Sequence, residues 1–238
     1  MLVSINDERL IAGFTTKFGG VSAGAFARLN LATHVGDDPS AVQQNREILR
    51  QRLGAKRLIF MEQIHSDIVV DLGDLESNLA QNLESNLKPN LTPCDSVITG
   101  AYGVCLCVMV ADCSPVLLFD KRRNLIAAIH AGRAGVLGKI ISKTIAKMCS
   151  NPSDIRAIIG PNIKKKCYEI GALELGEFSK FGQNGYFDMD AAIKFELENL
   201  GVAEFEFSSI CSHCDERFYS YRKSGQTGRF AGFIMLKG

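Results

Sequence analysis

Two residues with reactive side chains stand at the open ends of a predicted β-hairpin. Cys113 lies in the sequence Ala111-Asp112-Cys113-Ser114-Pro115, and His130 begins the sequence His130-Ala131-Gly132. A thiolate and an imidazole at strand ends can point into a shared cleft, where they suit either a transition-metal site or a Cys/His nucleophile pair. Both alternatives are catalytic chemistry, so we expect an enzyme.

The hairpin itself follows from two short apolar runs, residues 115–120 and 125–130, which a polar turn of four residues separates. With the turn centred, the numbers of paired residues sum to about 245, so that Pro115 faces His130. Cys113 is then a diagonal neighbour of His130, with the two backbones roughly 7–8 Å apart. That separation lets the two side chains share one small ion.

Histidine is scarce in this chain, which contains four. A lone histidine is usually structural or exposed to solvent. His65 differs because it lies in a polar break within an apolar segment, where a side chain can be presented and oriented. Together His65, Cys113 and His130 form a set of three ligands. Three protein ligands with an open position is the form that catalytic zinc sites take.

Two polar residues fall on or beside the apolar stripe of a predicted helix. Asp38-Pro39-Ser40 supplies an N-cap and a proline at the first helical position, and Gly54 closes the helix over roughly residues 39–53. Asn45 and Arg46 turn toward that stripe, and a polar residue turned inward needs a partner. They either bond loop carbonyls or contact a substrate or a phosphate.

Two further segments contain reactive or charged side chains. Cys211-Ser212-His213-Cys214 suggests a zinc ribbon, but no second C-x-x-C completes four ligands and no thioredoxin-like context supports a redox role. We interpret it as structural or incidental. Residues 220–229 place three cations with hydroxyls and glycines in a loop, which is either an anion or sugar contact or a solvated basic turn.

The composition limits the class of protein. A chain of 238 residues that is 46% hydrophobic has enough apolar surface for the core of one large domain. With 27 Lys and Arg against 26 Asp and Glu, the net charge is +1, so no global field attracts nucleic acid or an anionic membrane. A small molecule is the expected partner.

The sequence shows no targeting segment. Charge appears near the start before any apolar run develops, and no uncharged apolar stretch of about 18 residues follows. We therefore expect a cytoplasmic protein. In a reducing compartment the eight cysteines are expected to be free thiols, most of them in the core, as Cys105 and Cys107 are within the apolar run 104–110.

Strands and helices interleave without regular alternation. Beyond the hairpin, the patterns predict strands over 58–72 with a polar interruption, 104–110 and 155–159, and helices over 135–148 and 188–200. Several strands and few helices favour an α+β fold over a doubly wound one.

Residues 75–91 contain a near-duplication, in which LESNL recurs after eight residues. Its asparagine and serine content disfavours a stable helix. We interpret the segment as a surface loop or a frayed short helix. We expect it to form a surface insertion at about residues 74–92 of a single domain that spans residues 1–238.

These motifs, together with several others, resemble the YfiH-like laccase-domain family, whose members were once called multicopper polyphenol oxidases and are now associated with purine nucleoside phosphorylase and adenosine deaminase activity. The similarity covers nearly the whole chain. The segments that carry it are residues 15–22, 29–31, 34–38, 45–46, 63–65, 111–113, 130–132, 159–161, 167–169, 220–222 and 227–229. The resemblance implies one α+β domain of the YfiH or cysteine-deamidase-like type, with central mixed β-sheets flanked by helices. It assigns His65, Cys113 and His130 to the family's zinc-ligand positions.

The chain departs from the family pattern near these ligands. Where the family usually reads His-Ala-Gly-Trp-Arg-Gly, Arg133 stands in place of the tryptophan and Ala134 in place of the arginine. Lys17 replaces a common arginine, and Ser66 replaces a common glycine. We expect the metal site to tolerate these changes and the substrate preference to respond to them.

A zinc-dependent purine nucleoside enzyme is the leading expectation, with phosphorolysis of adenosine, inosine or methylthioadenosine and hydrolytic deamination of adenosine as its reactions. Zinc would activate a water for attack at C6, and phosphate would attack the ribose C1′ carbon beside a cationic pocket. Asp112 adjoins the ligand Cys113 and suits proton transfer or ligand orientation. The residues that we expect to act are Asp112, Cys113 and Arg46 in catalysis, and Lys17, His34, Asn45 and Arg222 in binding substrate.

Other classes stay open. Cys113 as a nucleophile with His130 as its base would make a hydrolase or amidase, as in cysteine deamidases, with peptidoglycan precursor editing as one setting. A non-catalytic protein that binds a metal and nucleosides is the third alternative. A multicopper laccase centre is excluded because it needs many more histidines than four, although copper out-competes zinc for a single His/Cys/His site.

Overall fold

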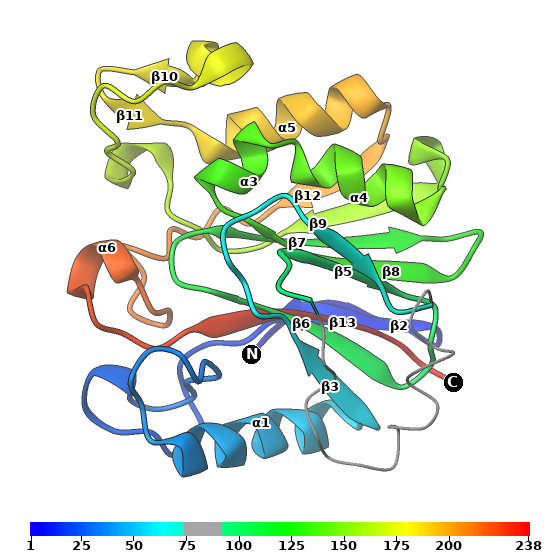
Figure 1. The fold of residues 1–238 in the computed structure, drawn as a ribbon. Helices are drawn as coiled ribbons and strands as arrows, with labels where there is room; N and C mark the ends of the chain where they lie inside the picture. Colours follow the sequence, from blue (N-terminus) through cyan, green and yellow to red (C-terminus); the bar gives the residue numbers. More distant parts are fainter. Residues whose placement is uncertain (74–91) are drawn as a thin grey trace.

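Two mixed β-sheets stacked face to face make the centre of the molecule in the computed structural model, which describes residues 1–73 and 92–238 (Figure 1). The first sheet has the strand order β1-β2-β13-β6-β3 and the second has the order β12-β9-β7-β8-β5-β4. The strands of the first sheet are β1 (Leu2–Asn6), β2 (Leu10–Phe14), β13 (Phe230–Leu236), β6 (Val104–Val110) and β3 (Arg57–Phe60). Those of the second are β12 (Glu204–Phe207), β9 (Ile155–Ile159), β7 (Ser114–Asp120), β8 (Leu125–Ala131), β5 (Ser96–Thr99) and β4 (Val69–Asp71). Each sheet contains parallel and antiparallel pairs, which confirms the predicted α+β class with mixed sheets.

Helices cover the outer faces of both sheets (Figure 1). α1 (Pro39–Leu53) lies against the first sheet, while α3 (Arg133–Leu137), α4 (Ile140–Met148) and α5 (Met189–Leu200) lie against the second. The Asp38 side chain caps the first turn of α1, and the helix ends at a glycine in the left-handed conformation. The bounds of α1 and α5 confirm the two helices predicted there.

Strand β6 shows why the sequence is continuously apolar where a strand is central. Leu106 and Val108 pack between the two sheets. Cys105 and Cys107 point to the opposite face and pack under α1. A strand that is covered on both faces needs an apolar residue at every position, because successive side chains alternate between the faces.

The predicted hairpin is confirmed, with its register. Pro115 pairs with His130, and Val116 pairs with Ile129, across β7 and β8. Residues 58–72 form two strands with a polar interruption, as predicted, but β3 joins the first sheet and β4 joins the second. The loop between them therefore crosses from one sheet to the other.

The single helix predicted over residues 135–148 is wrong, because α3 and α4 are separate. Lys139 has a φ of 59°, a left-handed conformation that an α-helix cannot contain. At Gly138 a Cβ atom would lie 2.8 Å from a carboxylate oxygen of Asp67, so the crossing loop presses against the break. Because this contact joins segments that are far apart in sequence, the local sequence pattern does not predict the break between α3 and α4.

The cysteines are free thiols, as predicted. Three of the eight, Cys94, Cys105 and Cys107, are buried. The prediction that most of them belong to the core is therefore wrong, since the others lie in loops or at the ends of elements rather than within central strands.

The remaining elements are short. They are β10 (Gly182–Gln183), β11 (Tyr186–Phe187), α6 (Tyr221–Ser224) and the 3₁₀ turns η1 (Gly24–Phe26), η3 (Pro152–Asp154), η4 (Lys165–Cys167) and η5 (Gly176–Phe181). The insertion predicted at about residues 74–92, with its duplication over 75–91, lies outside the described residues apart from Thr92. Over the described ranges, no helix combines the length and the apolar character needed to cross a bilayer.

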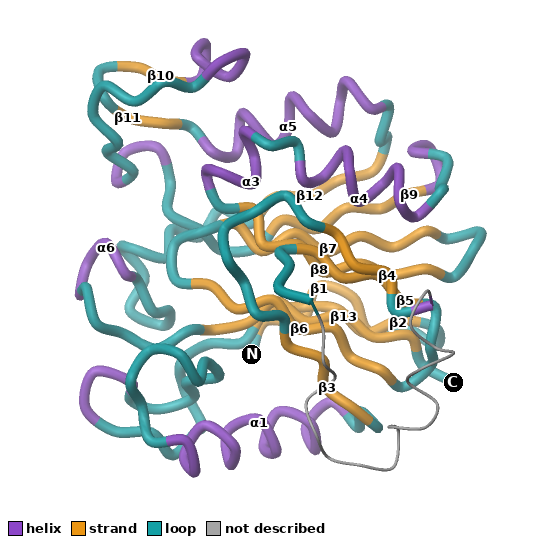
Figure 2. The backbone as a smooth tube through the Cα atoms, in the orientation of Figure 1, coloured by secondary structure: helices purple, strands orange, loops and turns teal. Residues whose placement is uncertain are grey.

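Loops gather at one end of the sandwich, where strands of both sheets stop (Figure 2). The crossing loop between β3 and β4, the link between β6 and β7, and the end of β8 meet there. Side chains that are distant in sequence can therefore converge at this end.

Candidate functional site

Three side chains meet at this end of the sandwich. His65 lies on the crossing loop, Cys113 directly precedes β7, and His130 is the penultimate residue of β8. Their ligand atoms all lie within 4.8 Å of one another. The two imidazole rings are 4.8 Å apart between centroids and nearly perpendicular, with an interplanar angle of 81°. The structure thus brings together the three residues that were predicted to form one cluster.

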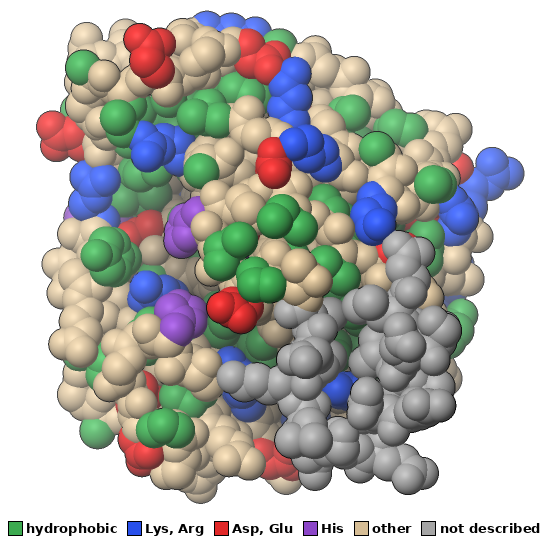
Figure 3. Space-filling view, in the orientation of Figure 1, with side chains coloured by type: hydrophobic (Ala, Val, Ile, Leu, Met, Phe, Trp, Pro, Cys, Tyr) green, Lys and Arg blue, Asp and Glu red, His purple; other side chains and the backbone are tan. Residues whose placement is uncertain are grey.

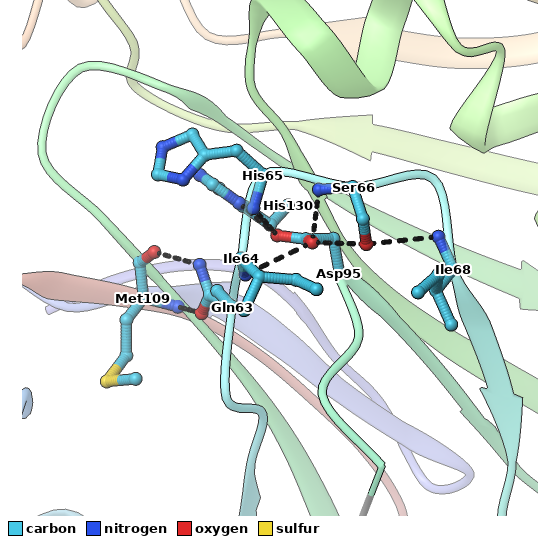
Figure 4. Close-up of polar contacts among 8 residues, drawn as sticks. All are labelled: Gln63, Ile64, His65, Ser66, Ile68, Asp95, Met109 and His130. Atoms are coloured by element: carbon cyan, nitrogen blue, oxygen red, sulfur yellow. Dashed lines mark hydrogen bonds and ion pairs between the residues drawn. The ribbon is translucent and has the colours of Figure 1, made fainter.

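Asp95 holds two of these residues in place (Figure 4). Its Oδ1 lies 2.7 Å from Nδ1 of His130 and accepts the backbone N–H of His65 at 3.1 Å. Its Oδ2 accepts backbone N–H bonds from Ile64 and Ser66 and a bond from the Ser66 hydroxyl. Since Nδ1 of His130 is engaged, Nε2 is left for the cluster, which is the arrangement that metal-ligating histidines commonly adopt.

Asp95 was missed by the sequence reasoning. It is fully buried and lies directly before β5, so the one signal in the chain is a carboxylate at the start of an apolar strand. Pairing of β5 with β8 is what brings it beside His130, whose backbone N–H also donates to the Asp95 carbonyl. Ser66, the departure from the family's glycine, adds a hydroxyl bond to this carboxylate.

A second anchor fixes the crossing loop to the first sheet. The side chain of Gln63 accepts the backbone N–H of Met109 at 2.8 Å and donates to the Met109 carbonyl at 2.7 Å. These two bonds continue the hydrogen bonding of β6 into the loop, as Figure 4 shows. His65 is therefore held between β6 on one side and Asp95 on the other, although its own φ of 60° is unusual for a residue with a side chain.

The charged groups in and beside the cluster stabilise one another's ionised forms. Burial acts to raise the pKa of Asp95, but the hydrogen bonds from His130 and Ser66 outweigh it and lower that pKa to about 2. Burial also opposes ionisation of Cys113 and protonation of His130. Attraction between the two nevertheless lowers the pKa of Cys113 to about 6 and raises the pKa of His130 to about 9. Without a metal, the pair is a thiolate and an imidazolium at neutral pH, and the thiolate is the form that binds metals and attacks electrophiles.

The space between the three ligands suits a metal ion. A Cβ atom at Gly132 would lie 3.2 Å from Sγ of Cys113, 3.3 Å from Cδ2 of His65 and 3.6 Å from Cε1 of His130. Glycine therefore keeps the centre of the cluster clear. His65 is exposed whereas His130 is buried, so the cluster is open to solvent on one side. Two nitrogens, one sulfur and an open side fit Zn²⁺ or a single copper ion.

Asp112 is engaged by the chain on both carboxylate oxygens. Oδ1 accepts the hydroxyl of Ser212 at 2.8 Å, and Oδ2 accepts the backbone N–H of Arg222 at 2.7 Å. Its carbonyl accepts the N–H of Ile163 at 2.8 Å. These bonds stabilise an unfavourable φ of 97° in the residue that precedes Cys113. Of the two roles predicted for Asp112, orientation of a ligand is the one that these contacts favour.

Cationic side chains lie beside the cluster. Partial burial lowers the pKa of His34, and the charges of Arg229 and Arg46 lower it further, as do His65 and His130. Electrostatic effects weaken with distance, so these four groups lie in the surroundings of His34. In Figure 3, histidine side chains flank a hollow on this face of the molecule, with Lys or Arg side chains beside them.

Arg46 extends from α1 toward this region. Its Nε donates to the carbonyl of Leu31 at 2.9 Å, and its guanidinium lies 3.9 Å from the centre of the Phe60 ring. Burial lowers its pKa to about 10, so it is a cation at neutral pH. Over residues 1–73 and 92–238, no carboxylate forms an ion pair with Arg46 or with the half-buried Arg229. Guanidinium groups of this kind are suited to bind an anion.

Asn45 holds a loop. Its side chain is fully buried, with Oδ1 accepting the N–H of Val21 and Nδ2 donating to the hydroxyl of Ser22 and to the carbonyls of Arg28 and Asn30. Of the two roles considered for Asn45, these contacts correspond to hydrogen bonding within a loop. The expectation that it contacts substrate is corrected, because its hydrogen-bonding groups are already used.

Lys17 lies in the loop that follows β2. Its backbone N–H donates to the carbonyl of Arg217, and its carbonyl accepts the N–H of Leu29. The described contacts do not join its half-buried side chain to the cluster. Its part in binding substrate stays a prediction.

An aromatic side chain stands near the cluster on the other side. Arg222 donates to the carbonyl of Glu169 at 2.7 Å, and its guanidinium lies 5.8 Å from the centre of the Tyr168 ring. Burial raises the pKa of Tyr168 and the charge of Cys113 raises it further, while Arg133 and Arg222 lower it. Tyr168 thus supplies an aromatic ring in the region where Arg133 replaces the family's tryptophan.

Known proteins are similar to this chain along nearly its whole length. The family model described as multi-copper polyphenol oxidoreductase laccase matches residues 11–237. A purine nucleoside phosphorylase of Corynebacterium glutamicum is 37% identical, with 94% of this chain and 93% of that protein covered. A purine nucleoside phosphorylase of Streptomyces coelicolor is 35% identical, with 94% of each chain covered.

Solved structures share the fold as well. A Neisseria meningitidis protein superimposes with a TM-score of 0.85 at 34% identity, covering 100% of this chain and 99% of that one. The YfiH protein of Bacillus licheniformis superimposes with a TM-score of 0.82 at 31% identity, covering 96% of this chain and 93% of that one. Sequence and fold agree, so the chain belongs to the multi-copper polyphenol oxidoreductase laccase family, to which the YfiH-like proteins are related.

Proposed function

We propose that this protein is a metal-dependent purine nucleoside phosphorylase that acts on adenosine, inosine or methylthioadenosine with inorganic phosphate. The observation that carries the proposal is the proximity of the cluster of His65, Cys113 and His130 to the cations Arg46 and Arg229. Metal ligands beside guanidinium groups that form no ion pair with the described carboxylates match a reaction in which an anion attacks a polarised substrate. The names of relatives that are 35% and 37% identical support the same reaction.

Zinc is the metal that we propose, held by one nitrogen of each histidine and by Sγ of Cys113. A zinc ion in this cluster supplies Lewis-acid polarisation of the substrate. Asp95 keeps His130 in the tautomer that offers Nε2, and Gly132 keeps the centre of the cluster clear. A single copper suits the same ligands, so the metal content of the purified protein is part of the test.

The cations provide for the phosphate. In phosphorolysis a phosphate oxygen forms a bond to C1′ of the ribose while the bond from C1′ to N9 of the purine breaks, and its electron pair leaves with the base, which takes up a proton. Arg46 and Arg229 suit the binding and orientation of the phosphate by paired N–H donors. His34, whose lowered pKa makes it neutral at pH 7, can donate to or accept from the same anion.

We assign the side of the cluster near Tyr168 to the purine base. An aromatic ring offers a stacking surface, and Arg133 and Arg222 lie close enough to the Tyr168 hydroxyl to lower its pKa. Asp112 acts as a positioning residue, because its carboxylate ties Ser212 and the backbone of Arg222 to the residue before Cys113. Arg133, absent from the usual family pattern, is the residue that we expect to alter substrate preference.

Hydrolytic deamination of adenosine is a second activity that we propose for the same cluster. Water adds at C6, ammonia leaves and inosine is formed, without phosphate. The support is the donor set, because histidine and cysteine ligands with an open position also occur in zinc deaminases of nucleobases. Base release and deamination give different products, so one assay separates them.

The test is a panel of adenosine, inosine and methylthioadenosine, each with and without inorganic phosphate, on zinc-loaded protein and on Cys113→Ala. Chromatography should show free base only when phosphate is present, and inosine from adenosine in either case. Cys113→Ala should form neither product. Equal turnover by both proteins would move the reaction away from this cluster, and stoichiometric nucleoside binding without turnover would leave a binding protein.

A cysteine hydrolase or amidase is the competing function, and one observation favours it. Cys113, His130 and Asp95 are linked in series, and the pKa of the thiol is lowered to about 6. The two functions differ in their need for metal. Metal-free protein that stays active and is inactivated by iodoacetamide would support the nucleophile, whereas activity that disappears with the metal and returns with zinc supports the phosphorylase.

A further inference from the structure

A second group of sulfur and nitrogen ligands lies outside the site described above. Sγ of Cys167 is 3.4 Å from Sγ of Cys214, which is 3.9 Å from Nδ1 of His213. The ligand atoms of these three residues all lie within 4.8 Å of one another. Cys211 contributes a third thiol that lies near the other two cysteines, although its Sγ is not one of the ligand atoms that all lie within 4.8 Å of one another. The short motif at residues 211–214, interpreted from sequence as incidental, therefore gains a distant partner in Cys167.

Turns rather than strands build this group. The N–H groups of Cys214 and Asp215 donate to the carbonyl of Cys211 at 3.2 and 2.9 Å, which folds the chain back on itself. An isolated bridge between Asn162 and Cys211 aligns this turn with the segment that leads to Cys167 at the end of η4. The ligands thus come from two segments that meet only in the folded chain.

A backbone N–H group contacts one of the sulfurs. The N–H of Lys164 donates to Sγ of Cys211 at 3.5 Å. Hydrogen bonds of this kind favour the thiolate, which is the form that binds a metal. The hydrogen bond therefore favours the ionised form of the Cys211 side chain in the absence of a metal ion.

The spacing of the ligand atoms matches a metal better than a disulfide. In a tetrahedral zinc site with Zn–S of about 2.3 Å and Zn–N of about 2.0 Å, ligand atoms lie roughly 3.5–3.8 Å apart. The two measured separations, 3.4 and 3.9 Å, lie on either side of that range. A disulfide needs sulfurs about 2.05 Å apart, and it would leave Cys211 and His213 unused.

We propose that Cys167, Cys211, His213 and Cys214 bind a second zinc ion in a closed site that stabilises the fold. Three thiolates and an imidazole complete a tetrahedron, so no position is left for substrate. The inference does not depend on the proposed function, because it uses other residues and another part of the chain.

The second zinc ion would stabilise the long connection between β12 and β13, which has little regular structure. Between β12 and β13, residues 208–229 contain α6 as their one helix. This connection carries Ser212 and Arg222, both of which bond the carboxylate of Asp112. A zinc ion at this group of ligands therefore stabilises a segment that contacts the residue before Cys113.

Zinc content per chain is the first test, measured on protein purified under reducing, oxygen-free conditions. Wild type should hold two zinc ions. Cys113→Ser, Cys167→Ser and Cys214→Ser should each hold one, and Cys149→Ser, which replaces an exposed cysteine outside both groups, should hold two. If Cys167→Ser and Cys214→Ser retain as much zinc as wild type, the proposal is wrong.

Cobalt binding by Cys113→Ser is the second test, and it does not require the cysteine variants of the second group to fold. This variant has no thiol left in the first cluster, so absorption from thiolate-bound cobalt must come from elsewhere. We expect that absorption at one equivalent of Co²⁺, with displacement by Zn²⁺. Its absence, or a Cys167–Cys214 disulfide found by mass spectrometry in the reduced, oxygen-free preparation, would overturn the proposal.

Discussion

The cluster of His65, Cys113 and His130 and the group formed by Cys167, Cys211, His213 and Cys214 use the same donor atoms on different kinds of backbone. The first is built at strand ends, with a buried carboxylate fixing one imidazole. The second is built from turns, with the backbone N–H of Lys164 directed at the Cys211 sulfur.

This difference in backbone corresponds to a difference in what the ligands can do. Three donors held by two sheets need no metal to stay in place and leave one side open, as a catalytic site requires. Four donors on turns have few strands to hold them, so an ion there contributes to folding. Variants in the two groups should therefore differ in what they damage.

Cys113→Ser tests the catalytic role of the cluster of His65, Cys113 and His130, and it should have the largest effect. We expect kcat/KM for phosphorolysis to fall on the order of 10⁴-fold, the scale seen when one member of a catalytic unit is lost. The melting temperature should change little, because β7 and β8 remain paired. Steady-state kinetics and a thermal melt measure both quantities. A variant that melts far below wild type while keeping activity would reverse the assignment.

Cys214→Ser tests the structural half. If zinc is present at about 1,000 times its dissociation constant, the site contributes about 4 kcal/mol, and its loss should lower the melting temperature by about 10 °C in a chain of this size. Activity at low temperature should be largely retained. Treatment of wild type with a chelator should lower the melting temperature likewise, and the treatment should have a smaller effect on Cys214→Ser.

Asp95→Asn examines how far the strand-end cluster depends on its buried carboxylate. The two oxygens accept five hydrogen bonds, so an amide group must turn its NH₂ toward donors in either orientation. We expect metal affinity and kcat/KM to fall about 10–100-fold. Asp215→Asn, in the turn-built region, is the matched control. Unchanged zinc affinity in Asp95→Asn would show that the strands alone orient His130.

Arg46→Gln tests whether Arg46 binds the phosphate rather than the nucleoside beside the first cluster. Loss of one charge-assisted contact, about 1.5–3 kcal/mol, should raise KM for phosphate about tenfold or more, with a smaller change in KM for the nucleoside. Arg122→Gln, at the turn of the hairpin far from Cys113, should leave both constants unchanged. Equal effects of the two substitutions would remove Arg46 from the phosphate site.

Ser212→Ala should have the smallest effect, and it tests whether the two groups are independent. The variant removes the hydroxyl that donates to Asp112, a buried bond worth about 1–3 kcal/mol when one partner is left unpaired. We expect a modest fall in unfolding free energy, a few-fold fall in kcat/KM and an unchanged zinc content. Loss of a zinc ion would show that the link is tighter than the hydrogen bond indicates.

Local patterns determined the elements that depend on nearby residues. The hairpin register followed from the length of its turn, and α1 and α5 followed from their caps and stop signals. The break at Lys139 did not, because the Asp67 loop that presses on Gly138 comes from a distant segment. Cys113 and His130 were recognised from residue types at the ends of one hairpin, and His65 was recognised from the polar break in an apolar segment.

The sequence by itself thus determined the class of fold and the family, and it predicted that His65, Cys113 and His130 form one cluster. Only the tertiary structure decided that Asp95 orients His130, that Asn45 anchors a loop, that Arg46 and Arg229 form no ion pair with any described carboxylate, and that Cys167 lies beside the motif at residues 211–214. The reason is physical. A turn or a cap depends on neighbours in the chain, whereas these contacts depend on which strands pair and on where a connection of many residues returns to the sheet.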